Sequence, residues 1–251
     1  CIKGRFGPIR DAWLSCFTAL ISPQARLLKA PSNIALDQLL GSLDIEATLE
    51  RGTLVHSEGL LKRVQSNFLL LPMAERIDIA VLALISQALD AGNQGDAYFG
   101  VIAFDESEAA EEGFSTRMTD RLAFEIYLDQ FSLADIQNNL EIHPEDIQKA
   151  KEQLPHVTCS LDFIEVLINA AFKLGVGSLR ANQFAVEAAK TLAALRGLQE
   201  VGQEEVVDAA RLVYTFSKIL HAPPQTEESS DQTDQDSEEN SNQQEDANQK
   251  Q

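Results

Sequence analysis

Short apolar runs alternate with a helical pattern in the first half of the chain, and this alternation constrains the fold more than any other feature. The runs NFLLLP (67–72) and YFGVIAF (98–104) are bounded by polar or turn residues, which is typical of strands covered on both faces. A helical apolar pattern over residues 77–91 separates them. The segments EIYL (125–128) and CIKG (1–4) favour two further strands. Strands that alternate with helices predict an α/β domain with a parallel sheet.

The second half of the chain has helical patterns only. They are expected over residues 132–153, 156–174, 178–198 and 203–221, with prolines and glycines between them. We therefore expect an α/β domain over residues 1–130 and an all-helical domain over residues 131–221. Residues 222–251 carry nine acidic side chains and one lysine, which gives −8 of the total net charge of −19. Such a segment cannot bury enough apolar surface to fold, so we expect a disordered acidic linker, with a specific acidic recognition motif as the alternative.

Charge and hydropathy exclude several classes of protein. A net charge of −19 argues against nucleic-acid binding, because a surface for nucleic acid needs clustered lysine and arginine. The most apolar stretch, residues 77–91, is shorter than the ~20 apolar residues that cross a bilayer, so no transmembrane segment is expected. Cys1, Cys16 and Cys159 and the histidines show no metal-ligand spacing, so neither a disulfide framework nor a metal site is expected.

GRFGPIRD (4–11) has the spacing of a phosphate-binding loop, G-x-x-x-x-G-K-[ST]. Gly4 and Gly7 are present, but Ile, Arg and Asp stand in the positions of the second consensus Gly, the Lys and the Ser or Thr. The apolar residues that follow recur with helical spacing: Ile9, Ala12, Trp13, Cys16, Phe17 and Leu20. Arg10 and Asp11 fall off that stripe, at a helix N-terminus where backbone N–H groups could face an anion. The substitutions predict weak or lost nucleotide binding, because Asp11 would place a carboxylate beside the phosphates.

The middle of the chain resembles a known family. The segments LDQLLGSLDIEATLERGTLVHSEGLLKRVQSNFLLLPMAER (36–76) and FGVIAFDESEAAEEGFSTRMTDRLAF (99–124) resemble the AAA+ module of the magnesium chelatases. The part GSLDIEATLERGTLVHSEGLLKR (41–63) looks like the helix insertion and hairpin of that branch. The resemblance covers about residues 1–220. It implies an α/β AAA+ P-loop module with a parallel sheet flanked by helices, an all-helical lid domain and a disordered acidic tail.

The resemblance is to the degenerate D subunit of these chelatases rather than to the active ATPase, subunit I. In active relatives an Asp-Glu pair ends the strand near residues 68–71, where the Asp supports Mg²⁺ and the Glu activates water. Here the two positions hold Pro72 and Met73, which can neither bind a metal nor accept a proton. Glu75 could be the base only with a shifted register, and Asp105 in the sensor-1 region is expected to cap a loop. We therefore expect no catalytic residue in cis.

Two arginines match family positions. Arg121 in TDRLAF matches the arginine finger, which stabilises charge on the γ-phosphate bound by a neighbouring subunit, and Arg180 in GSLRAN matches the sensor-2 arginine. The alternatives are a salt bridge on the surface or between domains for Arg121, and solvation of a helix start for Arg180. The resemblance implies that ATP and Mg²⁺ lie at an interface shared with a partner subunit, while binding by this chain itself stays open.

The implied function is that of an ATPase-deficient AAA+ subunit. By resemblance it would join a ring oligomer with the I subunit and relay ATP-driven rearrangement to the porphyrin-binding H subunit, where Mg²⁺ enters protoporphyrin IX in (bacterio)chlorophyll synthesis. The alternatives are a purely structural adaptor without nucleotide and an active AAA+ ATPase. Since the chain opens on Cys1, we expect a piece of a longer protein that lacks its N-terminus and a C-terminal integrin-I-like domain. The cytoplasm of a phototrophic bacterium is the expected location, with the plastid stroma as the alternative.

Overall fold

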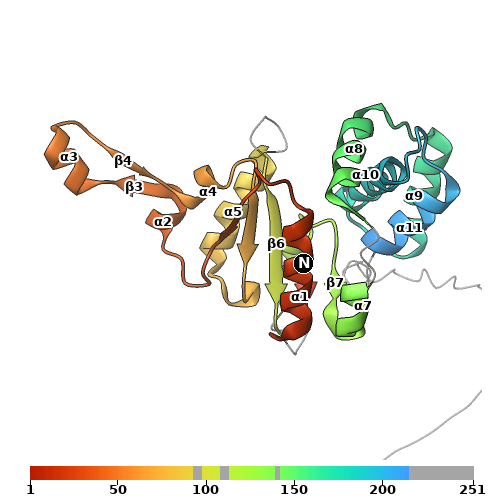
Figure 1. Cartoon of the computed structure of the whole chain (residues 1–251), viewed down its shortest axis with the longest axis horizontal. Helices are drawn as coiled ribbons and strands as arrows, with labels where there is room; N and C mark the ends of the chain where they lie inside the picture. The colour runs from red at the N-terminus through yellow and green to blue at the C-terminus, as the bar shows by residue number, and fades with distance from the viewer. Residues whose placement is uncertain (93–97, 108–112, 139–141, 215–251) are drawn as a thin grey trace, which may run out of the picture.

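A five-stranded parallel sheet forms the centre of the first domain (Figure 1). The computed structural model describes residues 1–92, 98–107, 113–138 and 142–214. The strands stand in the order β2-β5-β6-β1-β7. They are β1 (Ile2–Lys3), β2 (Leu27–Lys29), β5 (Phe68–Leu71), β6 (Gly100–Asp105) and β7 (Ile126–Tyr127). The sheet confirms the expected strands around residues 68–71, 100–104 and 126–127, and it adds β2, which the sequence pattern did not indicate.

Helices cover both faces of this sheet, because successive strand residues point to opposite sides. Leu69 and Leu71 belong to a core that α5 (Ile79–Gly92) covers, whereas Leu70 belongs to a second core with residues of α1 (Pro8–Leu20). In α1, the ring of Trp13 stacks on that of Phe17 at 5.4 Å between centroids. The shorter helices of this domain are α2 (Leu36–Leu40), α4 (Leu60–Arg63), η1 (Ala74–Arg76), α6 (Thr116–Thr119) and η3 (Leu128–Gln130).

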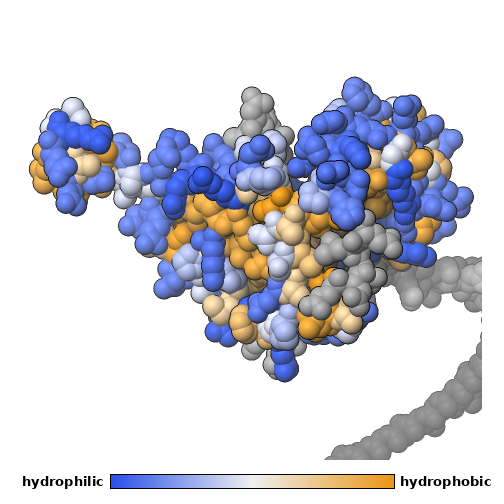
Figure 2. Space-filling view, viewed as in Figure 1, coloured by the Kyte–Doolittle hydropathy of each residue, from blue (hydrophilic) through white to orange (hydrophobic). Residues whose placement is uncertain are grey.

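A narrow arm projects from the sheet domain (Figure 1). It consists of an antiparallel hairpin, β3 (Gly41–Leu43) and β4 (His56–Glu58), with α3 (Ile45–Arg51) at its tip. The Asp44 side chain caps this helix by accepting a hydrogen bond from the Ala47 N–H at 2.9 Å. The tip exposes several large apolar side chains, and Figure 2 shows hydrophobic surface there. The most exposed are Ile45, Leu49 and Leu54. The arm has the hairpin and inserted helix that the family resemblance of residues 41–63 implies.

The helical lid is built around an alanine-rich helix. Its helices are α8 (Pro144–Gln153), η4 (Leu154–His156), α9 (Leu161–Lys173), α10 (Leu179–Leu195) and α11 (Gln203–Val213). Six alanines of α10 are buried, which lets the neighbouring helices approach closely. The expectation of one helix over residues 132–153 is wrong. The segment forms α7 (Leu133–Asn138), which packs against α1 of the sheet domain, and α8, whose first residue Pro144 cannot continue a preceding helix.

Two further expectations concern the end of the chain. The helix expected over 203–221 is α11, and it is described as far as Val213. The rest of that expectation, and the disordered linker expected over 222–251, lie outside the described residues. No helix of the described segments has the length and apolarity that crossing a membrane requires.

Candidate functional site

The loop between β1 and α1 is shaped by its first glycine. Gly4 has φ +154°, and its N–H donates to the Asp105 carbonyl at 3.1 Å, next to the carboxyl end of β6. A Cβ at Gly4 would lie 3.0 Å from Leu128 Cβ, so a side chain there would crowd the segment after β7. Gly7 is the N-cap residue of α1, and Asp11 is exposed in the first turn. The loop therefore leads from β1 into α1 at the carboxyl edge of the sheet.

The arginine at the consensus lysine position of this loop, Arg10, has its partners within the chain. Arg10 is only 9% exposed, and its guanidinium carbon lies 4.5 Å from the Phe6 ring centroid and 4.9 Å from that of Phe104. Its Nη1 also donates to the Glu106 carboxylate. Arg10 is thus stacked against two aromatic rings and neutralised by a carboxylate of the same chain. The sequence placed Arg10 at the helix start but gave no sign of these partners.

The carboxylates of Glu75, after β5, and of Asp105, at the end of β6, accept hydrogen bonds from backbone groups. Pro72 and Met73 follow the strand, and Met73 has a left-handed backbone with φ 49°. Glu75 accepts a hydrogen bond from the Glu106 N–H at 3.2 Å. Asp105 is 1% exposed and accepts from the N–H groups of Ser107 at 3.0 Å and Phe114 at 3.2 Å, which confirms the expected loop cap.

A second polar cluster brings Arg121 and Arg180 together on one carboxylate. Arg121 Nε lies 3.1 Å from both oxygens of Asp90, and its Nη2 lies 2.5 Å from Oδ2. Arg180 Nη1 donates to Asp90 Oδ1 at 2.8 Å, and its Nε lies 3.7 Å from Asp120 Oδ2. The hydrogen bonds from Arg121 and then from Arg180 lower the pKa of Asp90, and the bond to Asp90 raises the pKa of Arg121. We name Asp90, Arg121 and Arg180 the arginine cluster.

The arginine cluster and the glycine loop lie at opposite edges of the sheet. Arg121 and Arg180 line a hollow of about 430 Å³ together with residues at the starts of four strands: Ile2, Phe68, Gly100 and Ile126. The loop instead meets the end of β6 at Asp105. The five residue steps from Gly100 to Asp105 span about 16 Å, which is more than an arginine side chain reaches. In this structure the two arginines therefore lie too far from the loop of their own chain to contact it.

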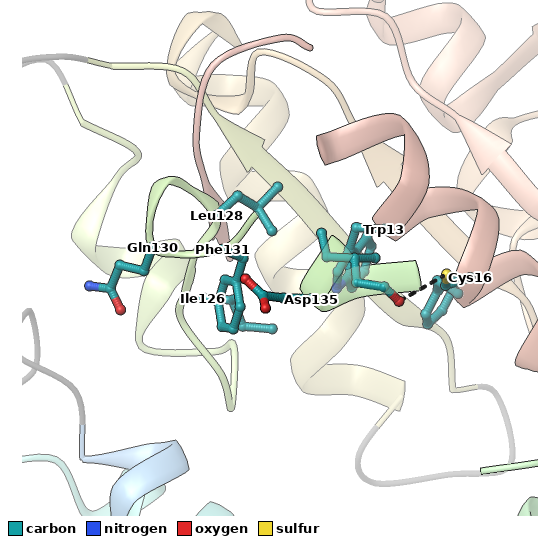
Figure 3. Close-up of a pocket in the computed structure, with 9 residues that line it drawn as sticks. Trp13, Cys16, Ile126, Leu128, Gln130, Phe131 and Asp135 are labelled. Carbon is teal, nitrogen blue, oxygen red and sulfur yellow. Dashed lines mark hydrogen bonds between the residues drawn. The ribbon is translucent and has the colours of Figure 1, made fainter. Parts of the chain in front are cut away.

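A larger hollow of about 680 Å³ opens between α1, the segment after β7, and α7 (Figure 3). Figure 3 shows Trp13 and Cys16 on one side and Phe131 and Asp135 on the other. Asp135 is held by the Ser132 N–H and hydroxyl at 2.8 and 2.6 Å, and these bonds lower its pKa. Its other described lining residues are mostly apolar, so this hollow offers packing surface, and the described side chains around it form no set of catalytic groups.

These features define a class of protein. A parallel sheet with a glycine loop after β1, followed by a helical lid, is an AAA+ module, and residues 164–239 match the model of the AAA lid domain. A crystal structure of a proposed ATPase from Cytophaga hutchinsonii shares the fold, with a TM-score of 0.61 and 16% identity over 84% of this chain and 75% of that one. Within this class, the chain is similar to the magnesium-chelatase subunits.

Two relatives carry this similarity. The chain is 34% identical over 227 residues to the magnesium-chelatase 60 kDa subunit of Rhodobacter capsulatus, a match that covers 89% of this chain and 38% of the relative. It is 31% identical over 229 residues to the 60 kDa subunit of Cereibacter sphaeroides, covering 90% and 39%. The chain thus spans less than two fifths of the length of these relatives. The resemblance expected from residues 36–76 and 99–124 is confirmed.

Proposed function

We propose that this chain is an AAA+ subunit of a magnesium chelatase that does not hydrolyse ATP itself. In this proposal it forms a ring with the ATP-hydrolysing I subunit and relays the rearrangement to the porphyrin-binding H subunit, where Mg²⁺ is inserted into protoporphyrin IX, in the cytoplasm of a phototrophic bacterium. The observation that carries the proposal is the position of Arg121 and Arg180, at the sheet edge opposite a loop in which Arg10 already pairs with Glu106.

The residues of the chain's own loop do not fit a hydrolysable magnesium nucleotide. Arg10 would have to leave Phe6, Phe104 and Glu106 before it could contact a phosphate. Asp11 offers a carboxylate where a hydroxyl would help to hold Mg²⁺. Pro72 and Met73 supply neither a metal ligand nor a base, and loss of a general base alone lowers a rate about 10²- to 10⁴-fold.

The arginine cluster supports a role in trans. In a ring with head-to-tail contacts, one edge of each subunit faces a different edge of the next. The edge that holds Arg121 can then face a neighbour's phosphate loop, where a guanidinium stabilises charge on the transferring phosphoryl group. Arg121 is held in a fixed orientation by Asp90 and by the Arg117 carbonyl, to which its Nη1 donates at 2.7 Å. ATP and Mg²⁺ at this shared interface are part of the proposal.

A second candidate is a structural adaptor that binds no nucleotide and supplies no catalytic residue. The observation that favours it is the bond of Arg121 and Arg180 to Asp90, because this salt bridge joins the sheet domain to the lid and gives both arginines a purely structural use. The two candidates differ in what removal of Arg121 does to ATP turnover by the partner.

The test is the Arg121→Ala variant of the full-length protein mixed with an I-type subunit. An arginine finger contributes about 10³- to 10⁵-fold in rate at its own site, so ATP turnover at the mixed interfaces and chelatase activity should fall sharply while assembly persists. Arg117→Ala, an exposed arginine on α6, is the matched control and should leave both rates unchanged. Intact assembly with unchanged rates in Arg121→Ala would refute the arginine finger and favour the adaptor.

A further inference from the structure

We propose that Asp90 is an internal competitor for the phosphate that the two arginines would bind, so that it latches the cluster until a neighbouring subunit presents a nucleotide. This inference rests on the proposed function, because the nucleotide belongs to that neighbour. Asp90 matches no nucleotide motif of the sequence, and its role follows from its position between two guanidinium groups.

The geometry around Asp90 is that of an anion held by two arginines. Both carboxylate oxygens accept from Arg121, and Oδ1 also accepts from Arg180. Guanidinium groups bind carboxylate and phosphate with the same forked geometry, so a phosphate can replace Asp90 without a new arrangement of donors. The side chains of Asp90, Arg121 and Arg180 are 36%, 21% and 31% exposed, which leaves the cluster open to a group from outside.

The charge balance explains why displacement is needed. Arg121 and Arg180 bring two positive charges, and Asp90 and the neighbouring Asp120 bring two negative ones, so the arginine cluster is neutral when Asp120 is counted with it. A multiply charged phosphate would meet Asp90 at close range and be repelled unless that carboxylate moved away. An anion from outside therefore replaces Asp90 only if it binds the two guanidinium groups more strongly than the carboxylate does.

Asp120 differs from Asp90 in its contacts and provides a comparison. Its Oδ1 accepts from the Ser178 hydroxyl at 2.6 Å, while Ser178 also caps α10 by accepting from the Ala181 N–H. Its other oxygen lies 3.7 Å from Arg180 Nε, a longer contact than any that Asp90 makes. Asp120 thus attaches the start of α10 to the sheet domain, whereas Asp90 neutralises the guanidinium groups.

The latch also couples the two domains. Arg121 follows α6 in the sheet domain and Arg180 lies on α10 of the lid, so Asp90 holds both on one carboxylate. A phosphate that displaces Asp90 keeps the two guanidinium groups together but removes their tie to α5. Binding in trans would then change how the lid is attached to the sheet domain.

The test uses inorganic pyrophosphate as the probe and the whole chain as the protein, with binding measured by calorimetry at low salt. Asp90→Asn keeps the size of the side chain and removes its charge, so pyrophosphate should bind about three- to tenfold more tightly than to the wild type. Asp120→Asn should change the affinity less than Asp90→Asn. The double variant Asp90→Asn/Arg121→Ala should lose this increase in pyrophosphate affinity. That loss would show that pyrophosphate binds at the arginine cluster rather than at the loop around Arg10.

Unchanged or weaker pyrophosphate binding by Asp90→Asn would overturn the latch. If that variant does not fold, Asp90→Ser serves as the second neutral substitution with the same expected gain. The outcomes separate the latch from the proposed function. Tighter pyrophosphate binding with no effect of Arg121→Ala on partner ATP turnover shows that Asp90 competes with anions for the two arginines, but it refutes action in trans. Reduced turnover in Arg121→Ala with no gain in Asp90→Asn keeps action in trans and refutes the latch.

Discussion

Replacing Arg10 should destabilise the fold, although a loop cation in an active ATPase serves the nucleotide. In Arg10→Ala the carboxylate of Glu106 loses its partner, and the rings of Phe6 and Phe104 lose the guanidinium between them. The substitution also leaves space next to β6, because Arg10 is 9% exposed. The perturbation therefore affects the start of α1 and the end of β6 at the same time.

The magnitude follows from these three contacts. The cation–π contact with the exposed Phe6 ring contributes about 0.5–1 kcal/mol and the one with the buried Phe104 ring up to about 2 kcal/mol, and a hydrogen bond between charged groups contributes about 1.5–3 kcal/mol. Because the contacts share one side chain and are not fully additive, we expect Arg10→Ala to lower the free energy of unfolding by about 2–4 kcal/mol. Arg10→Lys keeps the charge but loses the planar group that faces both rings, so it should lower the free energy of unfolding by less than Arg10→Ala does.

The chain supplies its own probe for this measurement. Trp13 is the single tryptophan, and its ring lies 6.1 Å from that of Phe104 in an edge-to-face contact. Urea unfolding followed by tryptophan fluorescence therefore reports on the part of the sheet domain that Arg10 stabilises. Arg26→Ala, at an exposed arginine of the same domain, is the control and should change stability by less than about 0.5 kcal/mol. A loss in Arg10→Ala no larger than that of the control would refute the reasoning.

Two further predictions concern the arm and the lid. A Cβ at Gly59 would lie 2.2 Å from the carbonyl carbon of Leu40. Gly59→Ala should therefore lower the free energy of unfolding by about 1–3 kcal/mol and speed amide exchange in the arm. Gly177→Ala is the control and should do neither, because a Cβ there meets nothing within 4 Å. The hydrogen bond from Arg196 lowers the pKa of Glu205 below its ordinary 4.5, so the stability it contributes is present above pH 4.5 and is lost as the pH falls through the lowered pKa. Urea unfolding between pH 7 and 3 should show that Glu205→Gln is less stable than the wild type at pH 7 and that its free energy of unfolding falls less on acidification. The same dependence of the free energy of unfolding on pH in both proteins would contradict this.

The sequence predicts those parts of the fold that depend on local pattern. The run at Phe68–Leu71 and the helix at Pro8–Leu20 have the periodicity of their elements, and both are found where expected. β2 has only three residues, Leu27–Lys29, which is too short for an alternating pattern, and its pairing with β5 depends on the rest of the sheet. The break between α7 and α8 falls inside the helix expected over residues 132–153, because that expectation extends the helical periodicity through Pro144, which cannot continue a preceding helix.

The candidate site was predictable only in part, because its contacts join distant segments. Arg121 and Arg180 could be singled out from motifs, but Asp90 lies 31 residues from the first and 90 from the second. Glu106 is likewise 96 residues from Arg10. Each acid is one of 39 in the chain, so only the topology of the sheet identifies which carboxylate each arginine meets.

The arm has a consequence for how related chains can diverge. At its base, a Cβ on Gly41 would lie 2.4 Å from the Ser57 carbonyl oxygen, and one on Gly59 would meet main-chain atoms as well. These two positions can therefore change only together with the course of the backbone. Leu49 and Leu54 at the tip are largely exposed and have no such limit. Descendants of one ancestor can thus inherit the shape of the arm unchanged while its tip varies one residue at a time.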